Sequence, residues 1–188
     1  MRIDLSSASV EDIIKFANAY LGDSFFNTFP DLKDRISVVL TGSIPLGNYD
    51  SESDIDLNFI FPEMLFKEYK AKLQEYKLQV VKDSPQVQPF FKDTFEQLQI
   101  LHEWNDDYRL KEFATAYIIL DSENKFSEFQ KSIAWYPDDI FKEKIHWLFA
   151  ELVFELEDRW KVALKRQDLY FIQVTKLRII SLIVNTLF

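Results

Sequence analysis

The chain has 188 residues, enough for one sizeable hydrophobic core or two small ones, and 47% of them are hydrophobic. There are 22 Lys and Arg residues against 31 Asp and Glu residues, which gives a formal net charge of −9. Proteins that bind nucleic acid through its phosphates usually carry a basic surface. This charge balance therefore disfavours polynucleotide substrates and suits a small cationic ligand. Cysteine is absent, which excludes disulfides, thiolate catalysis and cysteine-based zinc sites.

The amino terminus does not resemble a secretory signal. Residues 1–4 lead into a mixed polar stretch rather than an apolar core, so a cytoplasmic location is expected. A first helix is predicted after Ser9, which would act as N-cap with Asp12 three residues later in a capping box. Apolar residues follow at helical spacing as far as Gly22, which is expected to end the helix.

A buried strand is predicted over residues 36–40, followed by a tight turn at Gly42-Ser43. Because glycine has no Cβ, Gly42 lets the backbone approach a phosphate closely, and Ser43 offers a hydroxyl and a backbone N–H. If Ser43 also caps a short helix over residues 44–46, with Pro45 in its first turn, the helix N-terminus adds favourable partial charge. This turn is a candidate phosphate-binding loop.

The second predicted strand carries two carboxylates. Side chains alternate along a strand, so Asp54, Asp56 and Asn58 point to one face and the apolar residues between them to the other. Carboxylates this close repel each other and lose solvation, so the pair is costly unless a cation lies between them. Mg²⁺ commonly binds one or two carboxylates together with substrate phosphates. The pair therefore predicts a Mg²⁺ site; the structural alternative is a strand pair with a solvated acidic face.

The sequence over residues 38–61 resembles the nucleotidyltransferase superfamily, which includes the aminoglycoside and lincosamide adenylyltransferases. The resemblance lies in Gly42-Ser43, the Ser-Asp-Ile-Asp-Leu of residues 53–57, and Gly47 between them. It implies Mg²⁺-dependent transfer of a nucleoside monophosphate, AMP from ATP, to a hydroxyl of a small molecule such as an aminoglycoside or lincosamide antibiotic. One or two Mg²⁺ ions would be held by the two aspartates. The nucleotide would be contacted by Gly42, Ser43, Gly47 and Ser53.

The resemblance also implies a third carboxylate, on a strand beside the Asp-x-Asp, that binds metal or takes the proton from the attacking hydroxyl. After a helix predicted over residues 63–76, a third strand is predicted at residues 78–81. Asp83 at its end is then the candidate third catalytic acid.

Other positions for the third carboxylate stay open. If the strand lies later in the chain, Gln86 and Gln88 stand where an acid is expected. Glu96 and Glu103 are candidates only if the segment around residues 95–101 is extended. A chain without this acid would have weak catalysis or none, and the alternative function is an inactive, antitoxin-like nucleotide-binding module that acts through a protein partner.

The rest of the first domain is predicted as a helix and a strand. The helix begins at residue 104, with Asn105 or Asp106 as its cap, and ends at Ala116. The strand covers residues 117–121. Asp121, at its end, is better explained by turn chemistry than by catalysis.

The character of the chain changes to continuous helix at Pro137. One amphipathic helix is predicted over residues 140–166 and another over 169–188. Polar residues interrupt the second, which argues against a membrane span. Its apolar end suggests a homodimer contact or further helices beyond it. The predicted fold is therefore α+β: a nucleotidyltransferase-like mixed sheet flanked by helices in residues 1–134, then a helical bundle region in residues 135–188, which is expected to be incomplete.

Overall fold

A computed structural model describes residues 2–84, 86–101, 103–104 and 106–187 of the chain. Its contacts divide the chain into two compact units, Met1–Ala134 and Trp135–Phe188, and the boundary falls where the sequence changes to continuous helix. The first unit combines a mixed β-sheet with helices, and the second is helical. The predicted α+β class and the mixed sheet flanked by helices are confirmed.

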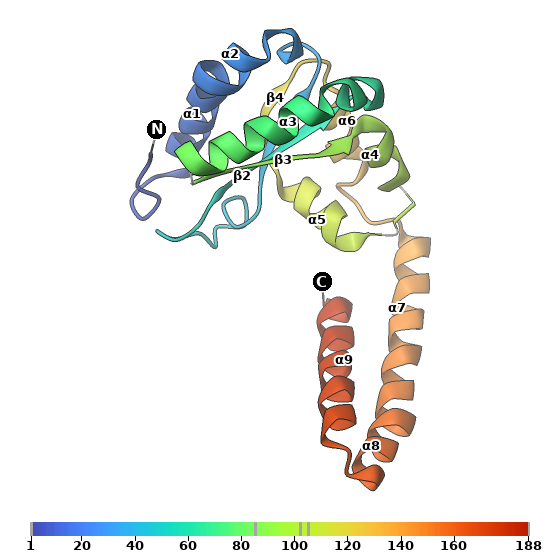
Figure 1. Cartoon of the computed structure of the whole chain (residues 1–188). Helices are drawn as coiled ribbons and strands as arrows, with labels where there is room; N and C mark the ends of the chain where they lie inside the picture. The colour runs from blue at the N-terminus through green and yellow to red at the C-terminus, as the bar shows by residue number, and fades with distance from the viewer. Residues whose placement is uncertain (1, 85, 102, 105, 188) are drawn as a thin grey trace. The chain divides into compact units, whose positions relative to one another are not determined.

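The first unit is built around four strands (Figure 1). In chain order its elements are α1 (Val10–Tyr20), the π-helical turn η1 (Leu21–Phe25), α2 (Phe26–Thr28), the 3-10 turn η2 (Pro30–Leu32), β1 (Ser37–Thr41), β2 (Ile55–Phe61), α3 (Glu63–Asp83), β3 (Val87–Thr94), α4 (Phe95–Leu101), α5 (Asp107–Thr115), β4 (Tyr117–Asp121) and α6 (Lys125–Ser132). The strand order is β3-β2-β1-β4. Strand β1 runs antiparallel to β2 and β4, whereas β2 and β3 are parallel.

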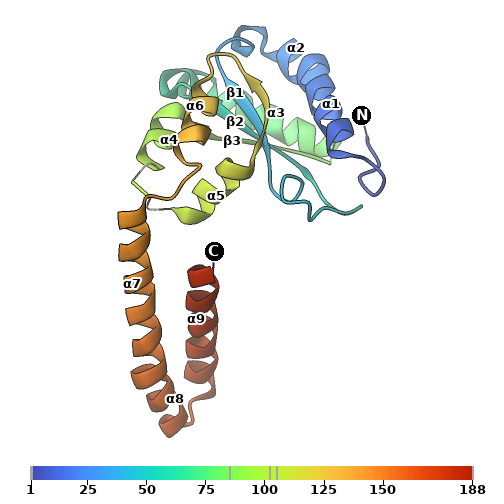
Figure 2. The same ribbon diagram turned by 180° about the vertical axis from the view of Figure 1, so that it is seen from behind.

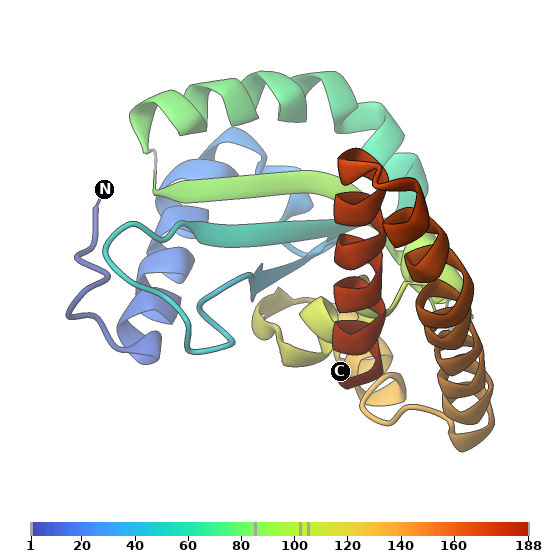
Figure 3. The same cartoon turned by 90° about the horizontal axis from the view of Figure 1, so that it is seen from below.

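The two faces of this sheet are covered by different helices (Figures 1 and 2). The apolar side chains of β2, Ile55, Leu57 and Phe59, enter a core that is closed by α1, η1 and α3. Rings from distant segments meet there, with the centroids of Phe25 and Phe59 4.5 Å apart. Helix α5 contacts β1 on the other side, and α3 runs along the β3 edge (Figure 3). The alternation predicted for β2 therefore holds, because its polar residues lie on the face toward α5.

The start of α1 agrees with the prediction and its end does not. Ser9 and Asp12 form the predicted capping box. The chain does not leave the helix at Gly22, because the π-helical turn η1 continues it toward α2. A Cβ built on Gly22 would meet nothing within 4 Å, so neither packing nor backbone conformation requires glycine there.

The strand predicted at residues 78–81 is wrong. These residues are the last turns of α3, and Leu73, Tyr76 and Val80 are buried at helical spacing along it. Leu78 and Val81 made the segment look like a strand, but both side chains are exposed. The burial period of three to four residues shows that the helix continues to Asp83. The third strand in the chain is β3, which begins at Val87.

The carboxylate of Asp121 has a structural role at the start of α6. It accepts hydrogen bonds from the Ser37 hydroxyl at 2.6 Å, the Ser127 hydroxyl at 2.6 Å, and the backbone N–H groups of Ser127 and Phe126. Burial alone would raise the pKa of Asp121, but these hydrogen bonds outweigh burial and hold the pKa below its ordinary value of 3.8. Turn and capping chemistry therefore account for this residue.

We expect Asp121→Asn to lower the free energy of unfolding by about 1 kcal/mol at pH 7, because an amide loses the charge that strengthens these hydrogen bonds. The folded-state pKa is depressed, so this stabilisation is complete above about pH 4 and disappears as the pH falls further. Urea unfolding at pH 7 and pH 3 measures the difference. Glu123→Gln, at an exposed carboxylate paired with Lys125, is the matched control and should change little.

The second unit is a helical hairpin of α7 (Asp138–Phe154), the π-helical turn η3 (Glu155–Arg159), α8 (Trp160–Arg166) and α9 (Leu169–Leu187). Helices α7 and α9 pack against each other. The Glu155 carboxylate is fully buried. It forms ion pairs with Arg178 Nε at 2.6 Å and with Arg159 Nη1 at 3.4 Å. Both predicted helices are confirmed, apart from Phe188, which lies outside the described residues. No helix in the described part of the chain is long and apolar enough to cross a membrane.

Candidate functional site

The antiparallel pairing of β1 and β2 brings the glycine turn against the acidic pair. Thr41 is the Cα partner of Asp56, so Gly42 leaves β1 directly beside that carboxylate. The φ angle of Gly42 is +77°, and a Cβ built on it would lie 2.2 Å from Asp56 Oδ2. Glycine is therefore required at this position by backbone conformation and by the close approach of the side chain. Gly42 and Asp56, predicted as parts of one site, lie in contact.

The electrostatic environment of Asp56 is unfavourable to a bare carboxylate. The pKa of this half-buried group is raised from 3.8 to about 6, first by burial and then by the negative charges of Asp54 and Glu112, while Lys92 partly opposes the rise. Asp54 lies just before β2 and is exposed. A cation bound between Asp54 and Asp56 would relieve both the burial cost and the repulsion.

In metal-free buffer we expect Asp56→Asn to stabilise the fold at neutral pH. Asp56 has a raised folded-state pKa, so its ionisation destabilises the folded protein. This loss of stability develops as the pH rises from about 4 to about 6. The gain should be about 1 kcal/mol at pH 7, because solvent screens a half-exposed group, and it should vanish below pH 4. Thermal melts in EDTA across this range test the sign; a destabilised variant at pH 7 would contradict it.

The turn after Gly42 differs from the helix considered from the sequence. Residues 43–48 form hydrogen-bonded turns, with Asn48 N–H donating to the Ser43 carbonyl and Gly47 N–H to the Ile44 carbonyl, both at 3.0 Å. The short helix over residues 44–46 is therefore wrong, and no helix N-terminus contributes at Ser43. Gly47 adopts a φ of +70° within this turn, a backbone conformation that favours glycine.

Ser53, predicted to contact the nucleotide, is occupied by a local contact. Its hydroxyl accepts a hydrogen bond from the Asp50 backbone N–H at 3.0 Å and donates to Asp50 Oδ1 at 3.2 Å. These bonds close the turn that leads into β2. The structure therefore gives Ser53 a scaffolding role before the Asp-x-Asp strand.

The candidates for the third carboxylate are not where the sequence placed them. Asp83 is exposed at the C-terminal end of α3, so the strand on which its catalytic role depended does not exist. Glu96 lies on α4 and accepts a hydrogen bond from the Glu63 backbone N–H. On β3, the strand that does lie beside β2, the Cα partner of Asp56 is Gln88.

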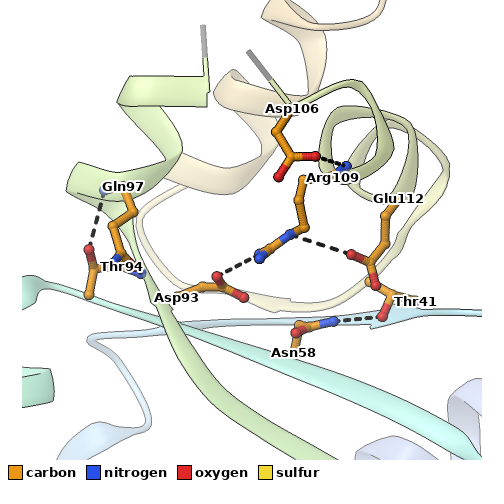
Figure 4. Close-up of polar contacts among 8 residues, drawn as sticks. All are labelled: Thr41, Asn58, Asp93, Thr94, Gln97, Asp106, Arg109 and Glu112. Atoms are coloured by element: carbon orange, nitrogen blue, oxygen red, sulfur yellow. Dashed lines mark hydrogen bonds and ion pairs between the residues drawn. The ribbon is translucent and has the colours of Figure 1, made fainter. Parts of the chain in front are cut away.

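A polar cluster that sequence reasoning did not find lies on the same side of the sheet (Figure 4). Arg109 on α5 donates from Nη2 to Asp93 Oδ1 on β3 at 2.6 Å, and its Nε lies 3.5 Å from Glu112 Oε2. The guanidinium also lies over the Phe113 ring at 4.9 Å. The spacing of Arg109 and Glu112 on one predicted helix was readable, but their partner on a separate strand was not.

Among the described residues, three buried polar atoms in this region lack hydrogen bonds, and one of them is the donor Arg109 Nε. Asn58, 2% exposed, donates from Nδ2 to Thr41 Oγ1 at 2.6 Å, but its Oδ1 has no partner. Asp93 Oδ2 is also buried and accepts no hydrogen bond from the described residues. An unpaired buried polar atom costs about 1–3 kcal/mol, so such atoms are uncommon unless a ligand or water serves them.

The donor set fits a Mg²⁺ ion that is completed by substrate. Within the described ranges, no group of three or more His, Asp or Glu side chains is arranged to hold a metal ion alone. Asp54 and Asp56 supply two carboxylates, the share that proteins commonly give to Mg²⁺ when phosphates provide other ligands. The missing Cβ of Gly42 lets the turn lie directly against the Asp56 carboxylate, so a phosphate bound by the turn would also meet the metal ligands.

A family model matches the C-terminal part of the chain. Residues 104–188 match the model of a family described as a domain of unknown function, DUF4037. The matched segment contains α5 and the helical unit, and therefore Arg109 and Glu112, but neither Gly42 nor Asp56. No curated protein matches the chain significantly.

Proposed function

We propose that this chain is a Mg²⁺-dependent nucleotidyltransferase that moves AMP from ATP to a hydroxyl of a small molecule, such as an aminoglycoside or lincosamide antibiotic. The observation that carries the proposal is the contact between Gly42 and Asp56, with Asp54 beside them. The contact sets a backbone turn suited to polyphosphate against a carboxylate pair that a cation would stabilise. The net charge of −9 supports a small, cationic acceptor rather than a polynucleotide.

The proposal gives each residue of the site its own role. Asp54 and Asp56 would hold Mg²⁺, whose charge stabilises the negative charge on the phosphates. The backbone of the Gly42-Ser43 turn would face the β and γ phosphates, and Ser43 would donate its N–H and hydroxyl to them. The acceptor oxygen forms a bond to the α-phosphorus while the bond to the β-phosphate oxygen breaks. Pyrophosphate leaves with the electron pair, and the hydroxyl proton passes to a base.

Transfer of label from [α-³²P]ATP tests this function. The purified full chain is incubated with Mg²⁺ and a panel of aminoglycosides, lincosamides and serine- or tyrosine-containing proteins. We expect a labelled small-molecule product and release of pyrophosphate, both abolished by EDTA. Labelled ATP that stays intact across the panel would contradict the proposal.

A second function is favoured by the residue opposite Asp56. The Cα partner on β3 is Gln88, an amide that cannot take a proton from a hydroxyl. A chain without a base would bind Mg–nucleotide without turnover and act through a protein partner. Calorimetry with a non-hydrolysable ATP analogue, alongside the transfer assay, separates the two functions: tight binding with no labelled product favours the binding module.

A further inference from the structure

Helix α5 carries the carboxylate of Glu112 on the side of the sheet that also holds Asp56. The helix contacts β1, and in Figure 4 the Glu112 side chain points toward Thr41, which is the Cα partner of Asp56. The Glu112 side chain is 20% exposed, so it is partly accessible from outside the protein. In Figure 4 the Glu112 carboxylate and the Asp93 carboxylate flank the Arg109 guanidinium from opposite sides.

Arg109 is anchored beside this carboxylate. Its guanidinium is bound at one end by Asp93, whose side chain is 6% exposed, and lies over the Phe113 ring. A planar guanidinium held in this way keeps its charge in a fixed place, and Nε lies at ion-pair distance, 3.5 Å, from Glu112 Oε2 without a hydrogen bond to any described residue. Asp93 is enclosed and paired with Arg109, so it is poorly placed to meet a substrate.

Buried polar atoms of both kinds lack hydrogen bonds in the same region, and one of them is the donor Arg109 Nε. Asn58 Oδ1 and Asp93 Oδ2 are both buried and without partners in the described part of the chain. Both residues lie on strands β2 and β3, on the side of the sheet that α5 covers. These unpaired atoms mark a polar region between the sheet and α5 in which water or a ligand group would be stabilised.

We infer that Glu112 is the catalytic base, supplied by helix α5 rather than by a strand, and that Arg109, anchored on Asp93, is its positioning residue. The inference rests on the proposed function. As the acceptor oxygen bonds to the α-phosphorus and pyrophosphate leaves with the electron pair, the hydroxyl proton moves to a Glu112 carboxylate oxygen and later to water. Gln88 on β3 then need not serve as the base, because the carboxylate that takes the proton is supplied by helix α5.

The test compares binding with turnover in matched variants. For Glu112→Gln, an isosteric amide, we expect kcat for AMP transfer to fall at least about 100-fold, in line with loss of a general base. The Kd for Mg²⁺ with a non-hydrolysable ATP analogue should stay within about threefold of wild type, within the scatter of a residue that does not bind the nucleotide. Glu112→Asp should recover part of kcat. Glu128→Gln, an exposed glutamate on α6, is the control and should match wild type.

Arg109→Lys tests the positioning role. Lysine keeps a positive charge near Asp93 but lacks the planar fork that also faces Glu112. We expect kcat to fall about tenfold with an unchanged KM for ATP, because only the orientation of the base is lost. A purely structural role would lower the melting temperature and leave kcat unchanged.

The outcomes separate this inference from the function on which it rests. An active wild type with an equally active Glu112→Gln variant overturns the assignment of Glu112 alone. Loss of nucleotide binding in Glu112→Gln also overturns it, since a base is not needed for binding. A wild type that transfers no label to the acceptor panel overturns both claims.

Discussion

Asp56→Asn is expected to abolish AMP transfer, with a loss of roughly 1,000-fold in kcat/KM. Removing one carboxylate of the pair removes several kcal/mol of stabilisation of the transferring phosphate, and each 1.36 kcal/mol is tenfold in rate. Asp54→Asn should act in the same direction. Steady-state transfer of label from [α-³²P]ATP measures both losses. Because the raised pKa of Asp56 disfavours its charged form, the Asp56→Asn loss should come without destabilisation of the metal-free protein.

The matched control for these variants is Asp83→Asn. Asp83 is an aspartate at the exposed end of α3, and it was the third catalytic acid expected from the sequence. Its replacement should leave transfer within about twofold of wild type, because exposed surface substitutions rarely act on a distant site. Full activity in Asp56→Asn, or loss of activity in Asp83→Asn, would contradict the site described above.

Gly42→Ala is expected to reduce transfer about 100-fold with only a modest loss of stability. The new Cβ would lie 2.2 Å from Asp56 Oδ2, so the Asp56 carboxylate must move away from residue 42. Misplacing a catalytic group by about 1 Å costs on the order of 100-fold in rate. The positive φ adds about 1–2 kcal/mol of backbone strain.

The three glycines of the chain provide the controls for this variant. Gly47 also has a positive φ, but a Cβ there would meet nothing within 4 Å, so Gly47→Ala should cost similar stability and keep activity. Gly22 has neither constraint, and Gly22→Ala in its helical segment should be neutral or stabilising by up to about 1 kcal/mol. Chemical unfolding and the transfer assay on all three variants separate strain from displacement of Asp56. Equal activity in the Gly42 and Gly47 variants would refute the displacement.

The sequence predicted the elements whose periodicity is local. The capping box at Ser9, the alternation along β2, the strand at residues 117–121 and the two long helices of the second unit all follow from spacing within one segment. The errors arose where spacing was ambiguous. The run at residues 78–81 is apolar enough for a strand, and only the burial of Val80 on the same face as Tyr76 shows the helix.

The candidate site was predictable in part for the same reason. Gly42 and Asp56 are brought together by the antiparallel pairing of two strands that are consecutive in the chain, so motif spacing was sufficient. In the Asp93–Arg109–Glu112 cluster, a residue of β3 contacts residues of α5. The place of Asp93 depends on the parallel pairing of β3 with β2, which includes a register shift between Asn58 and Ile60. Spacing within one segment of the sequence does not predict such a contact between two segments.

The most direct test of the account is Mg²⁺-dependent binding of a non-hydrolysable ATP analogue, measured by titration calorimetry on the full chain and on Asp56→Asn. Our account predicts saturable binding to the wild type with Mg²⁺, which is lost in EDTA and lost in the variant. Equal binding by the variant, or binding that is indifferent to Mg²⁺, would show that the two aspartates do not share a metal with the nucleotide.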